Sequence, residues 1–101
     1  MVHTQKHIID FISKNKPFLR KQFHVSKIGV FGSYARNEQT SNSDIDLIVD
    51  FEENTENLFE IKIALKNFFK DRLNTEVDIC RGKYIKSRYK NRILNETIYV
   101  D

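Results

Sequence analysis

Two short patterns in this 101-residue sequence place acidic and small polar residues at spacings that could support metal and phosphate binding. Asp44 and Asp46 alternate within an apolar run, so on a β-strand both carboxylates would emerge from one face, about 7 Å apart. Two carboxylates this close raise each other's pKa unless a cation separates them, and Mg²⁺ prefers oxygen ligands and substrate phosphates. The alternative is a pair of solvated aspartates that cap the preceding loop, since the pattern alone is common.

The second pattern is Gly32-Ser33, which directly follows the apolar segment Ser26–Phe31. Glycine lets the backbone approach phosphate oxygens closely, and a serine hydroxyl with an adjacent N–H can donate hydrogen bonds to them. The alternative is a tight turn in which Ser33 caps a helix. Together the patterns form a spaced signature, Gly-Ser-x10-Asp-x-Asp, from Gly32 to Asp46. This combination favours a site that binds phosphate and a metal ion.

Apolar periodicity predicts the elements that must position these residues. In chain order, we expect a helix over Thr4–Ser13, a second short helix beginning near Pro17, a strand over Ser26–Phe31, a turn into a short helix after Gly32-Ser33, a loop over Asn37–Ser43, a strand over Asp44–Phe51, a long helix over Thr55–Leu73, a strand over Thr75–Cys80 and a helix over Lys83–Glu96. This order predicts an α/β (α+β) fold, a small mixed sheet packed by helices, with one domain over residues 1–101. It leaves open whether the helices cover one face or both.

The segment Asp44–Phe51 is the clearest strand, and period two assigns its two faces. We expect Ile45, Leu47, Val49 and Phe51 on one face and Asp44, Asp46, Ile48 and Asp50 on the other. In the strand over Thr75–Cys80, Val77 and Ile79 point inward, so Asp78 lies on the opposite face. If the two strands pair, Asp44, Asp46 and Asp78 converge on one patch. Asp50 would lie roughly 13 Å from Asp46, too far to share a metal ion.

Composition and charge narrow the class of protein. Seventeen Lys and Arg face fourteen Asp and Glu, which gives a formal charge of +3. This balance suits a polyanionic ligand or an acidic partner but does not indicate nucleic-acid binding. The N-terminus lacks a secretory apolar region, and no apolar run approaches the roughly 20 residues that cross a bilayer. The single Cys80 excludes an internal disulfide. We therefore expect a cytoplasmic protein without membrane or direct nucleic-acid binding.

Other polar residues leave alternatives open. Arg36 could contact phosphates or pair with Glu38, and Glu76 shares the face of Asp78 but is expected to be a solvated strand residue. The stretch Arg81–Arg92 holds six basic residues and no acidic one. It could be a solvated helix face, a docking surface for an acidic partner or a field that steers a triphosphate. No metal-ligand spacing to Cys80 is found for His3, His7 and His24.

The segment GSYARNEQTSNSDIDL, residues 32–47, resembles the minimal nucleotidyltransferases of the DNA-polymerase-β-like superfamily, specifically the antitoxins encoded beside HEPN-domain toxins. The resemblance rests on Gly32-Ser33 after a strand, Ala35-Arg36, Ser43 directly before Asp44, Asp46-Leu47, Asp78 in EVDIC and the closing segment YKNRILNETIYV. One departure is Asn37, where relatives usually carry glycine. It lies in the turn after the short helix, and asparagine tolerates left-handed geometry there.

The resemblance implies a polymerase-β-like nucleotidyltransferase head and a role for each site residue. Gly32 and Ser33 would hold the triphosphate of ATP. Asp44 and Asp46 would ligate one or two Mg²⁺ ions, and Asp78 would complete the metal site and could accept a proton from the acceptor hydroxyl. In this family the attack falls on the α-phosphate and pyrophosphate leaves.

The same resemblance implies a protein adenylyltransferase that neutralises a partner HEPN toxin by moving AMP onto a tyrosine hydroxyl. A binding-only antitoxin with a decayed site is one alternative, and the complete carboxylate trio argues against it. Nucleotidyl transfer to a small molecule such as an aminoglycoside is another. Those enzymes carry extra domains that form the acceptor pocket, for which we expect no room in 101 residues.

Overall fold

A mixed sheet of four strands forms the centre of the part of the chain that this computed structural model describes, residues 3–85 and 87–101. The strands are β1 (Val25–Phe31), β2 (Ile45–Phe51), β3 (Val77–Arg81) and β4 (Ile98–Tyr99), in the sheet order β3-β2-β1-β4. β1 runs antiparallel to both β2 and β4, whereas β2 and β3 are parallel. The predicted mixed sheet is therefore confirmed, with the two carboxylate-bearing strands as neighbours.

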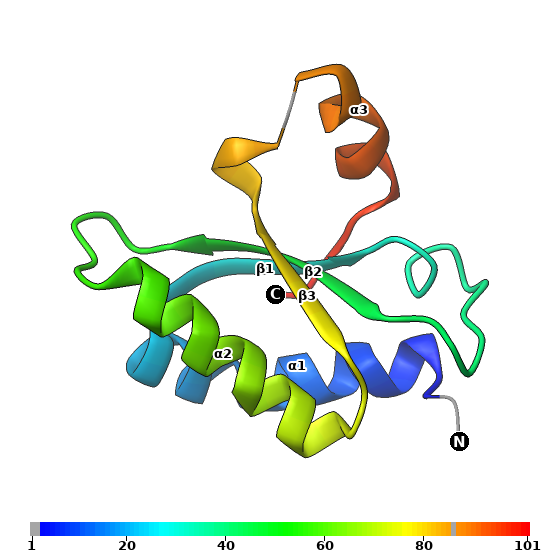
Figure 1. Ribbon diagram of the computed structural model, residues 1–101, viewed down its shortest axis with the longest axis horizontal. Coiled ribbons are helices and arrows are strands. Elements are labelled where there is room, and N and C mark those ends of the chain that lie inside the picture. The colour runs from blue at the N-terminus through cyan, green and yellow to red at the C-terminus, as the bar shows by residue number, and fades with distance from the viewer. Residues whose placement is uncertain (1–2, 86) are drawn as a thin grey trace.

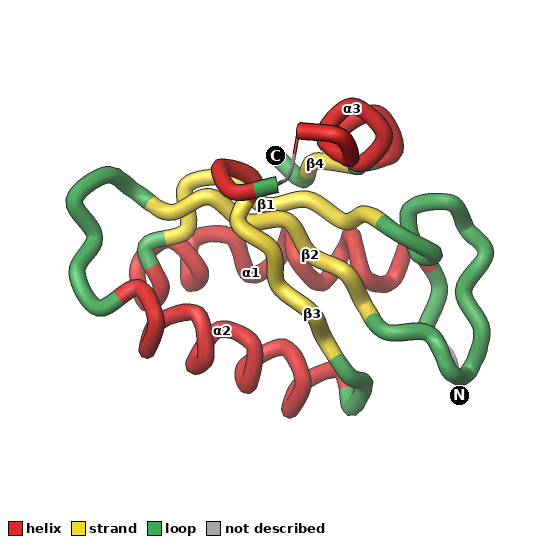
Figure 2. The backbone as a smooth tube through the Cα atoms, turned by 45° about the horizontal axis from the view of Figure 1, so that its top comes forward, coloured by secondary structure: helices red, strands yellow, loops and turns green. Residues whose placement is uncertain are grey.

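The helices lie on both faces of this sheet, which settles the point that sequence left open. α1 (Gln5–Phe23) and α2 (Leu58–Leu73) pack side by side under one face, and α3 (Ser87–Glu96) lies on the other side, close to β1 and β4 (Figure 1, Figure 2). A short 3₁₀-helix, Gly82–Tyr84, separates β3 from α3. The two long helices thus leave the opposite face of the sheet free, and α3 covers that face only near β1 and β4.

The hydrophobic core fills the space between the sheet and the two long helices. Alternate residues of the strands point into it, because side chains of a strand alternate between faces. Burying one such Ile, Leu or Phe side chain stabilises the fold by about 1.5–3 kcal/mol. The fully buried members include Ile8, Ile12, Leu19, Ile28, Val30, Ile45, Leu47, Val49, Leu65 and Phe69.

The N-terminal helix differs from the prediction of two helices. α1 runs without a break from Gln5 to Phe23 and contains Pro17. A proline inside a helix removes one hydrogen bond and costs about 3 kcal/mol. Burial of Ile8, Ile12 and Leu19, which lie before and after the proline on one helical face, offsets this cost. Phe18, directly after the proline, lies at the rim of the core and is 43% exposed.

The remaining boundaries shift for local reasons. α2 begins at Leu58 rather than Thr55, because Asn54 and Asn57 adopt positive φ angles of 62° and 58° that a helix does not allow. α3 begins at Ser87 because the residues after Gly82 form the 3₁₀-helix. Residues 32–37 form hydrogen-bonded turns instead of a regular helix. The strand β4 was not predicted, since two residues carry no readable alternation.

Candidate active site

The aspartates predicted to act together lie on neighbouring strands. Asp46 of β2 and Asp78 of β3 are register partners in the parallel pair, and adjacent strands are about 4.8 Å apart. Val77 and Ile79 are buried on the core side, so Asp78 emerges on the opposite face, as expected. Asp44 directly precedes β2, whose first residue Ile45 donates its N–H to the Glu76 carbonyl. Pairing therefore brings the three carboxylates to one end of one sheet face.

The surroundings of Asp46 perturb its acidity. Burial, followed by the charges of Asp78 and Asp44, raises the pKa of Asp46 to about 6, against an ordinary value of 3.8. The guanidinium of Arg36 opposes this shift, and Glu96 adds to it. A carboxyl group that is partly desolvated beside two other carboxylates is a position that favours a bound cation.

The backbone of Gly32 lies directly against the Asp46 carboxylate. Its φ is +74°, in the region that glycine adopts without steric cost. A Cβ at this position would collide with Oδ2 of Asp46, which would lie only 2.2 Å away. The turn therefore needs glycine both for its backbone angle and for its close approach to the Asp46 carboxylate.

The turn is held by contacts with the core and with α1, and by a hydrogen bond within the turn itself. The Tyr34 side chain is buried in the core, and Gln5 of α1 donates from Nε2 to the carbonyls of Tyr34 and Ala35, each at 3.0 Å. The Gly32 carbonyl accepts from the Arg36 N–H at 3.1 Å. No described residue accepts a hydrogen bond from the Ser33 N–H, and the Ser33 side chain is half-buried. These donors are therefore available where the sequence predicts phosphate oxygens.

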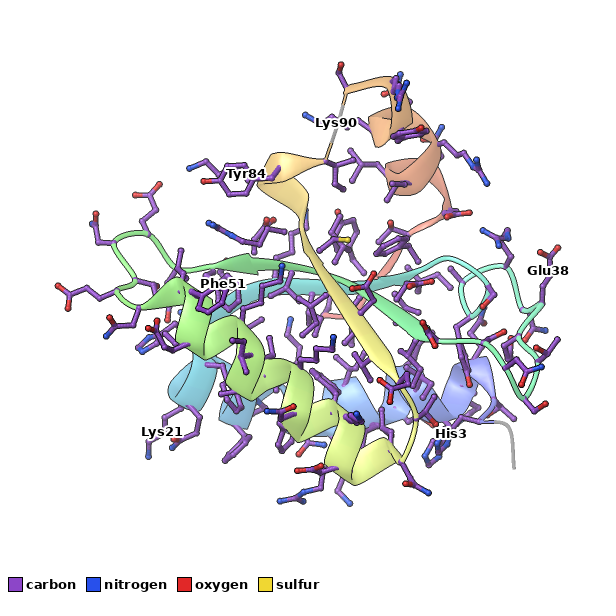
Figure 3. All side chains as sticks on the ribbon, viewed as in Figure 1. His3, Lys21, Glu38, Phe51, Tyr84 and Lys90 are labelled. Carbon is purple, nitrogen blue, oxygen red and sulfur yellow. The ribbon has the colours of Figure 1, made fainter. Side chains whose placement is uncertain are left out.

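Arg36 joins the turn to the end of the chain through Glu96, a residue that sequence reasoning did not single out. Its Nε donates to Glu38 and its Nη1 donates to Glu96, each at 2.9 Å. These hydrogen bonds raise the pKa of Arg36, with Glu38 making the larger contribution. Figure 3 shows Glu38 at the outer edge of its loop. Of the alternatives left open for Arg36, the structure shows the pair with Glu38, and Asn37 has a left-handed φ of 59°, which asparagine tolerates.

The fit of this site to a metal ion rests on the chemistry of its donors. Carboxylate oxygens are ligands that Mg²⁺ accepts, and a cation would relieve the charge repulsion that, after burial, raises the pKa of Asp46. Within residues 3–85 and 87–101, no three His, Cys, Asp or Glu side chains already stand close enough to hold a metal ion. Metal ligation by Asp44, Asp46 and Asp78 therefore stays a prediction.

The acidic end is an open surface. Asp44 and Asp78 are exposed, and Asp44 borders a shallow hollow of about 400 Å³ between the loop over residues 41–43 and the end of α2. A hollow of about 840 Å³ lies at the opposite end of the sheet and is lined by residues that include Phe51, Arg81 and Tyr84, but none of the candidate site residues. We place the site at the carboxylates because geometry and perturbed acidity coincide there.

Other singled-out residues lie away from this end or take structural roles. Glu76 is exposed and pairs with Lys70 at 3.0 Å, as a solvated residue would. His3 contacts the Leu73 carbonyl and stacks on His7, while His24 ends α1 in a left-handed conformation. Cys80 is half-buried, and burial followed by the charge of Asp78 raises the pKa of its thiol.

The basic stretch remains without an assigned role. α3 has no fully buried residue, and Arg81 stacks over the Tyr84 ring at 4.6 Å. Tyr84 and Lys90 lie on the side of the molecule that α3 occupies (Figure 3). Lys86, which belongs to this stretch, lies outside the described residues.

No described helix is both long and apolar enough to span a bilayer.

Comparison with known proteins identifies the family of this chain. The family model described as "Nucleotidyltransferase domain" matches residues 12–100. The chain is 41% identical over 100 residues to MJ0128 of Methanocaldococcus jannaschii, which is provisionally named a protein adenylyltransferase, and the match covers 96% of this chain and 98% of the relative. It is 37% identical over 97 residues to the protein adenylyltransferase MntA of Thermococcus cleftensis, covering 96% of both chains.

Solved structures share the fold. One that is provisionally identified as a minimal nucleotidyltransferase superposes with a TM-score of 0.77 at 27% identity over 95% of both chains. Another, described as a toxin–antitoxin with AMP-PNP, gives a TM-score of 0.68 at 23% identity and covers 85% of this chain and 68% of the other. The resemblance drawn from the residue pattern is thereby confirmed. The chain belongs to the nucleotidyltransferase domain family and is a minimal nucleotidyltransferase homologous to the protein adenylyltransferase MntA.

Proposed function

We propose that the protein transfers AMP from ATP to a tyrosine hydroxyl of a partner HEPN toxin and thereby acts as its antitoxin. The observation that supports this most directly is the register pairing of Asp46 with Asp78 beside the Gly32-Ser33 turn. Nucleotidyl transfer depends mainly on positioning the reactants and neutralising charge, and these are the groups it requires. Homology to protein adenylyltransferases supports AMP, rather than another nucleotide, as the group that is transferred.

In the proposed reaction, the acceptor oxygen forms a bond to the α-phosphorus while the bond from that phosphorus to the pyrophosphate oxygen breaks. The Ser33 N–H and hydroxyl would bind the triphosphate, and Gly32 would allow its close approach to the backbone. Asp78, which is exposed on the edge strand, would accept the proton of the acceptor hydroxyl. Mg²⁺ ligated by Asp44, Asp46 and Asp78 would neutralise the charge of the phosphates.

The openness of the site favours a protein acceptor over a small molecule. Asp44 and Asp78 are exposed, and Asp46 is half-buried at the same end of the sheet. Small-molecule sites are usually concave and bury most of their ligand. A tyrosine on the surface of a folded partner could reach the exposed Asp78 directly, whereas a small acceptor would find few walls to orient it.

The test is whether inhibition of the partner toxin requires covalent transfer of AMP to it. A HEPN toxin would be incubated with this protein, ATP and Mg²⁺, and its intact mass and ribonuclease activity measured before and after the two proteins are separated. We expect a mass gain of one adenylyl group and inactivity that persists after separation. Omission of ATP or Mg²⁺ should abolish both effects.

A matched control is the Asp44→Asn, Asp46→Asn double variant, which retains the same surface shape. A simple steric inhibitor would act without nucleotide, would be insensitive to these substitutions and would release active toxin on dissociation. Protection that vanishes on separation would reject the transferase mechanism in favour of binding alone.

A further inference from the structure

Glu96 is an acidic side chain in the closing segment whose two oxygens both bind the turn that precedes the aspartates. Its Oε1 accepts the Gly32 N–H at 3.2 Å, and its Oε2 accepts from Arg36 Nη1 at 2.9 Å. The side chain is only 17% exposed. A single carboxylate therefore links the C-terminal end of α3 to a turn that lies more than fifty residues earlier in the chain.

The position of Glu96 is fixed by contacts that do not involve Arg36. At the end of α3, Thr97 donates from its N–H and from Oγ1 to the Ile93 carbonyl, at 3.0 and 2.6 Å. The next residues, Ile98–Tyr99, form β4 and pair with Gly29 and Val30 of β1. Because β1 leads directly into the turn, the segment that carries Glu96 is anchored to the strand that positions Gly32.

Both groups that Glu96 holds depend on it. The Gly32 N–H belongs to a buried residue, and a buried donor left without an acceptor is destabilising. Without Glu96, Arg36 would keep only Glu38, whose side chain is 65% exposed. Exposed ion pairs contribute little to fixing a side chain. Loss of the carboxylate would therefore free both Arg36 and the first residue of the turn.

We propose that Glu96 is a positioning residue for nucleotidyl transfer, which holds the Gly32 amide and the Arg36 guanidinium so that the turn is preformed when the triphosphate arrives. This inference rests on the proposed function. Preformed donors cost no reorganisation when an anion binds, so they raise affinity. The Ser33 N–H remains available to a phosphate while Glu96 stays in place.

The opposite mechanism makes the opposite prediction. If the triphosphate had to displace Glu96 from Gly32 and Arg36, removing the carboxylate would eliminate a competitor and nucleotide would bind more tightly. The sign of the change in affinity therefore decides between positioning and competition.

The experiment measures the Kd of AMP-PNP with Mg²⁺ by isothermal titration calorimetry for wild type, Glu96→Gln and Glu96→Ala, well below each melting temperature. We expect Glu96→Ala to weaken binding about tenfold or more, since its two hydrogen bonds involve a charged group. Glu96→Gln keeps one acceptor oxygen and should fall between the two. Amide hydrogen exchange at Gly32 should accelerate in both variants.

Two matched controls separate positioning from loss of stability. Glu38→Ala removes the other partner of Arg36, and Lys16→Met removes a hydrogen bond to the Val100 carbonyl, directly after β4. Both should leave the Kd within about twofold of wild type.

Unchanged or tighter nucleotide binding in the Glu96 variants would overturn the inference while leaving the proposed function intact. Absence of nucleotide binding by wild type would instead reject the proposed function and the inference with it. If Glu96→Ala does not fold, the isosteric Glu96→Gln decides alone.

Discussion

Asp46 on β2 and Asp78 on β3 occupy the same register position of a parallel strand pair, on the sheet face opposite the buried Leu47 and Ile79. This relationship explains why two residues 32 positions apart in sequence share one electrostatic environment. Burial and the charges of Asp78 and Asp44 raise the pKa of Asp46 together. The pairing of the two strands therefore adds to the effect of burial on the pKa of Asp46.

The raised pKa of Asp46 predicts how stability depends on pH. The folded protein favours the protonated form, with a pKa of about 6 against an ordinary 3.8, so the free energy of unfolding falls as pH rises through this interval. Asp46→Asn removes the ionising group. In metal-free buffer, the variant should therefore melt at a higher temperature than wild type at about pH 8 and at the same temperature below the ordinary pKa. Thermal melts by circular dichroism at both pH values measure this.

Added Mg²⁺ serves as the complementary test of that prediction. It should raise the melting temperature of wild type, because a cation at the carboxylates relieves the repulsion, and should raise that of Asp46→Asn less. Equal melting temperatures of the two proteins at about pH 8 without metal would contradict the burial and charge repulsion assigned to Asp46.

Replacement of Gly32 should damage the site and the fold together. In Gly32→Ala, the positive φ would cost about 1–2 kcal/mol, and the new Cβ would displace the Asp46 carboxylate. We expect a lower melting temperature and loss of transfer. Gly82→Ala is the matched control, because its Cβ would meet Asp50 Oδ1 at 3.1 Å without a positive φ. If Gly32→Ala kept full transfer, the close approach of the turn to Asp46 would have no catalytic importance.

The Ser33 hydroxyl should contribute to nucleotide binding more than to stability. Its loss in Ser33→Ala should weaken the binding of Mg²⁺–ATP by roughly 1.5–3 kcal/mol, the value of a hydrogen bond to a charged group. The melting temperature should change little, since the hydrogen bond from the Glu38 N–H goes to the Ser33 backbone carbonyl and survives the substitution. Calorimetric titration and thermal melts of the same preparation measure the two quantities.

Ser26→Ala is the control for Ser33, because Ser26 also donates a hydroxyl hydrogen bond on β1, to the Asp50 carbonyl, but lies at the far end of the strand. It should leave nucleotide affinity unchanged. If Ser33→Ala lowered the melting temperature and not the affinity, the alternative of a capping serine would be the better interpretation.

The parts of the fold that sequence predicted are those in which local pattern and tertiary packing agree. The alternation in Asp44–Phe51 correctly assigned Ile45, Leu47 and Val49 to the core, and period two placed Asp78 on the opposite face of its strand. Left-handed geometry at Asn37 followed from the properties of asparagine. These features depend on neighbours only a few residues away.

The parts that sequence missed depend on distant contacts. Pro17 is a local signal for a helix start, but the buried stripe from Ile8 to Leu19 overrides it. The two-residue strand β4 exists only because β1 offers it an edge. Glu96 lies in the closing segment YKNRILNETIYV, but its importance arises from contacts with Gly32 and Arg36 that form only after folding. A local signal was that Glu96 is the first acidic residue after the basic stretch Arg81–Arg92.

Asp78 should affect the chemical step more than nucleotide binding. It is exposed on the edge strand β3, beside Asp46, where an incoming hydroxyl can reach it. General-base assistance contributes about 10²–10⁴ in rate, so Asp78→Asn should lose at least ~100-fold in transfer. Nucleotide should still bind with Mg²⁺, at somewhat lower affinity, because Asp44 and Asp46 remain. Single-turnover transfer and calorimetric titration of the same variant separate the two effects.

Glu76→Gln is the matched control for Asp78, since Glu76 is an exposed acid two residues earlier that pairs with Lys70. It should leave both measurements near wild type. Retained transfer in Asp78→Asn would reduce Asp78 to a strand-edge carboxylate without a catalytic role. Loss of binding and transfer together would identify it as a metal ligand first, because a missing ligand weakens the Mg²⁺–nucleotide complex, whereas a missing base slows only the step that follows binding.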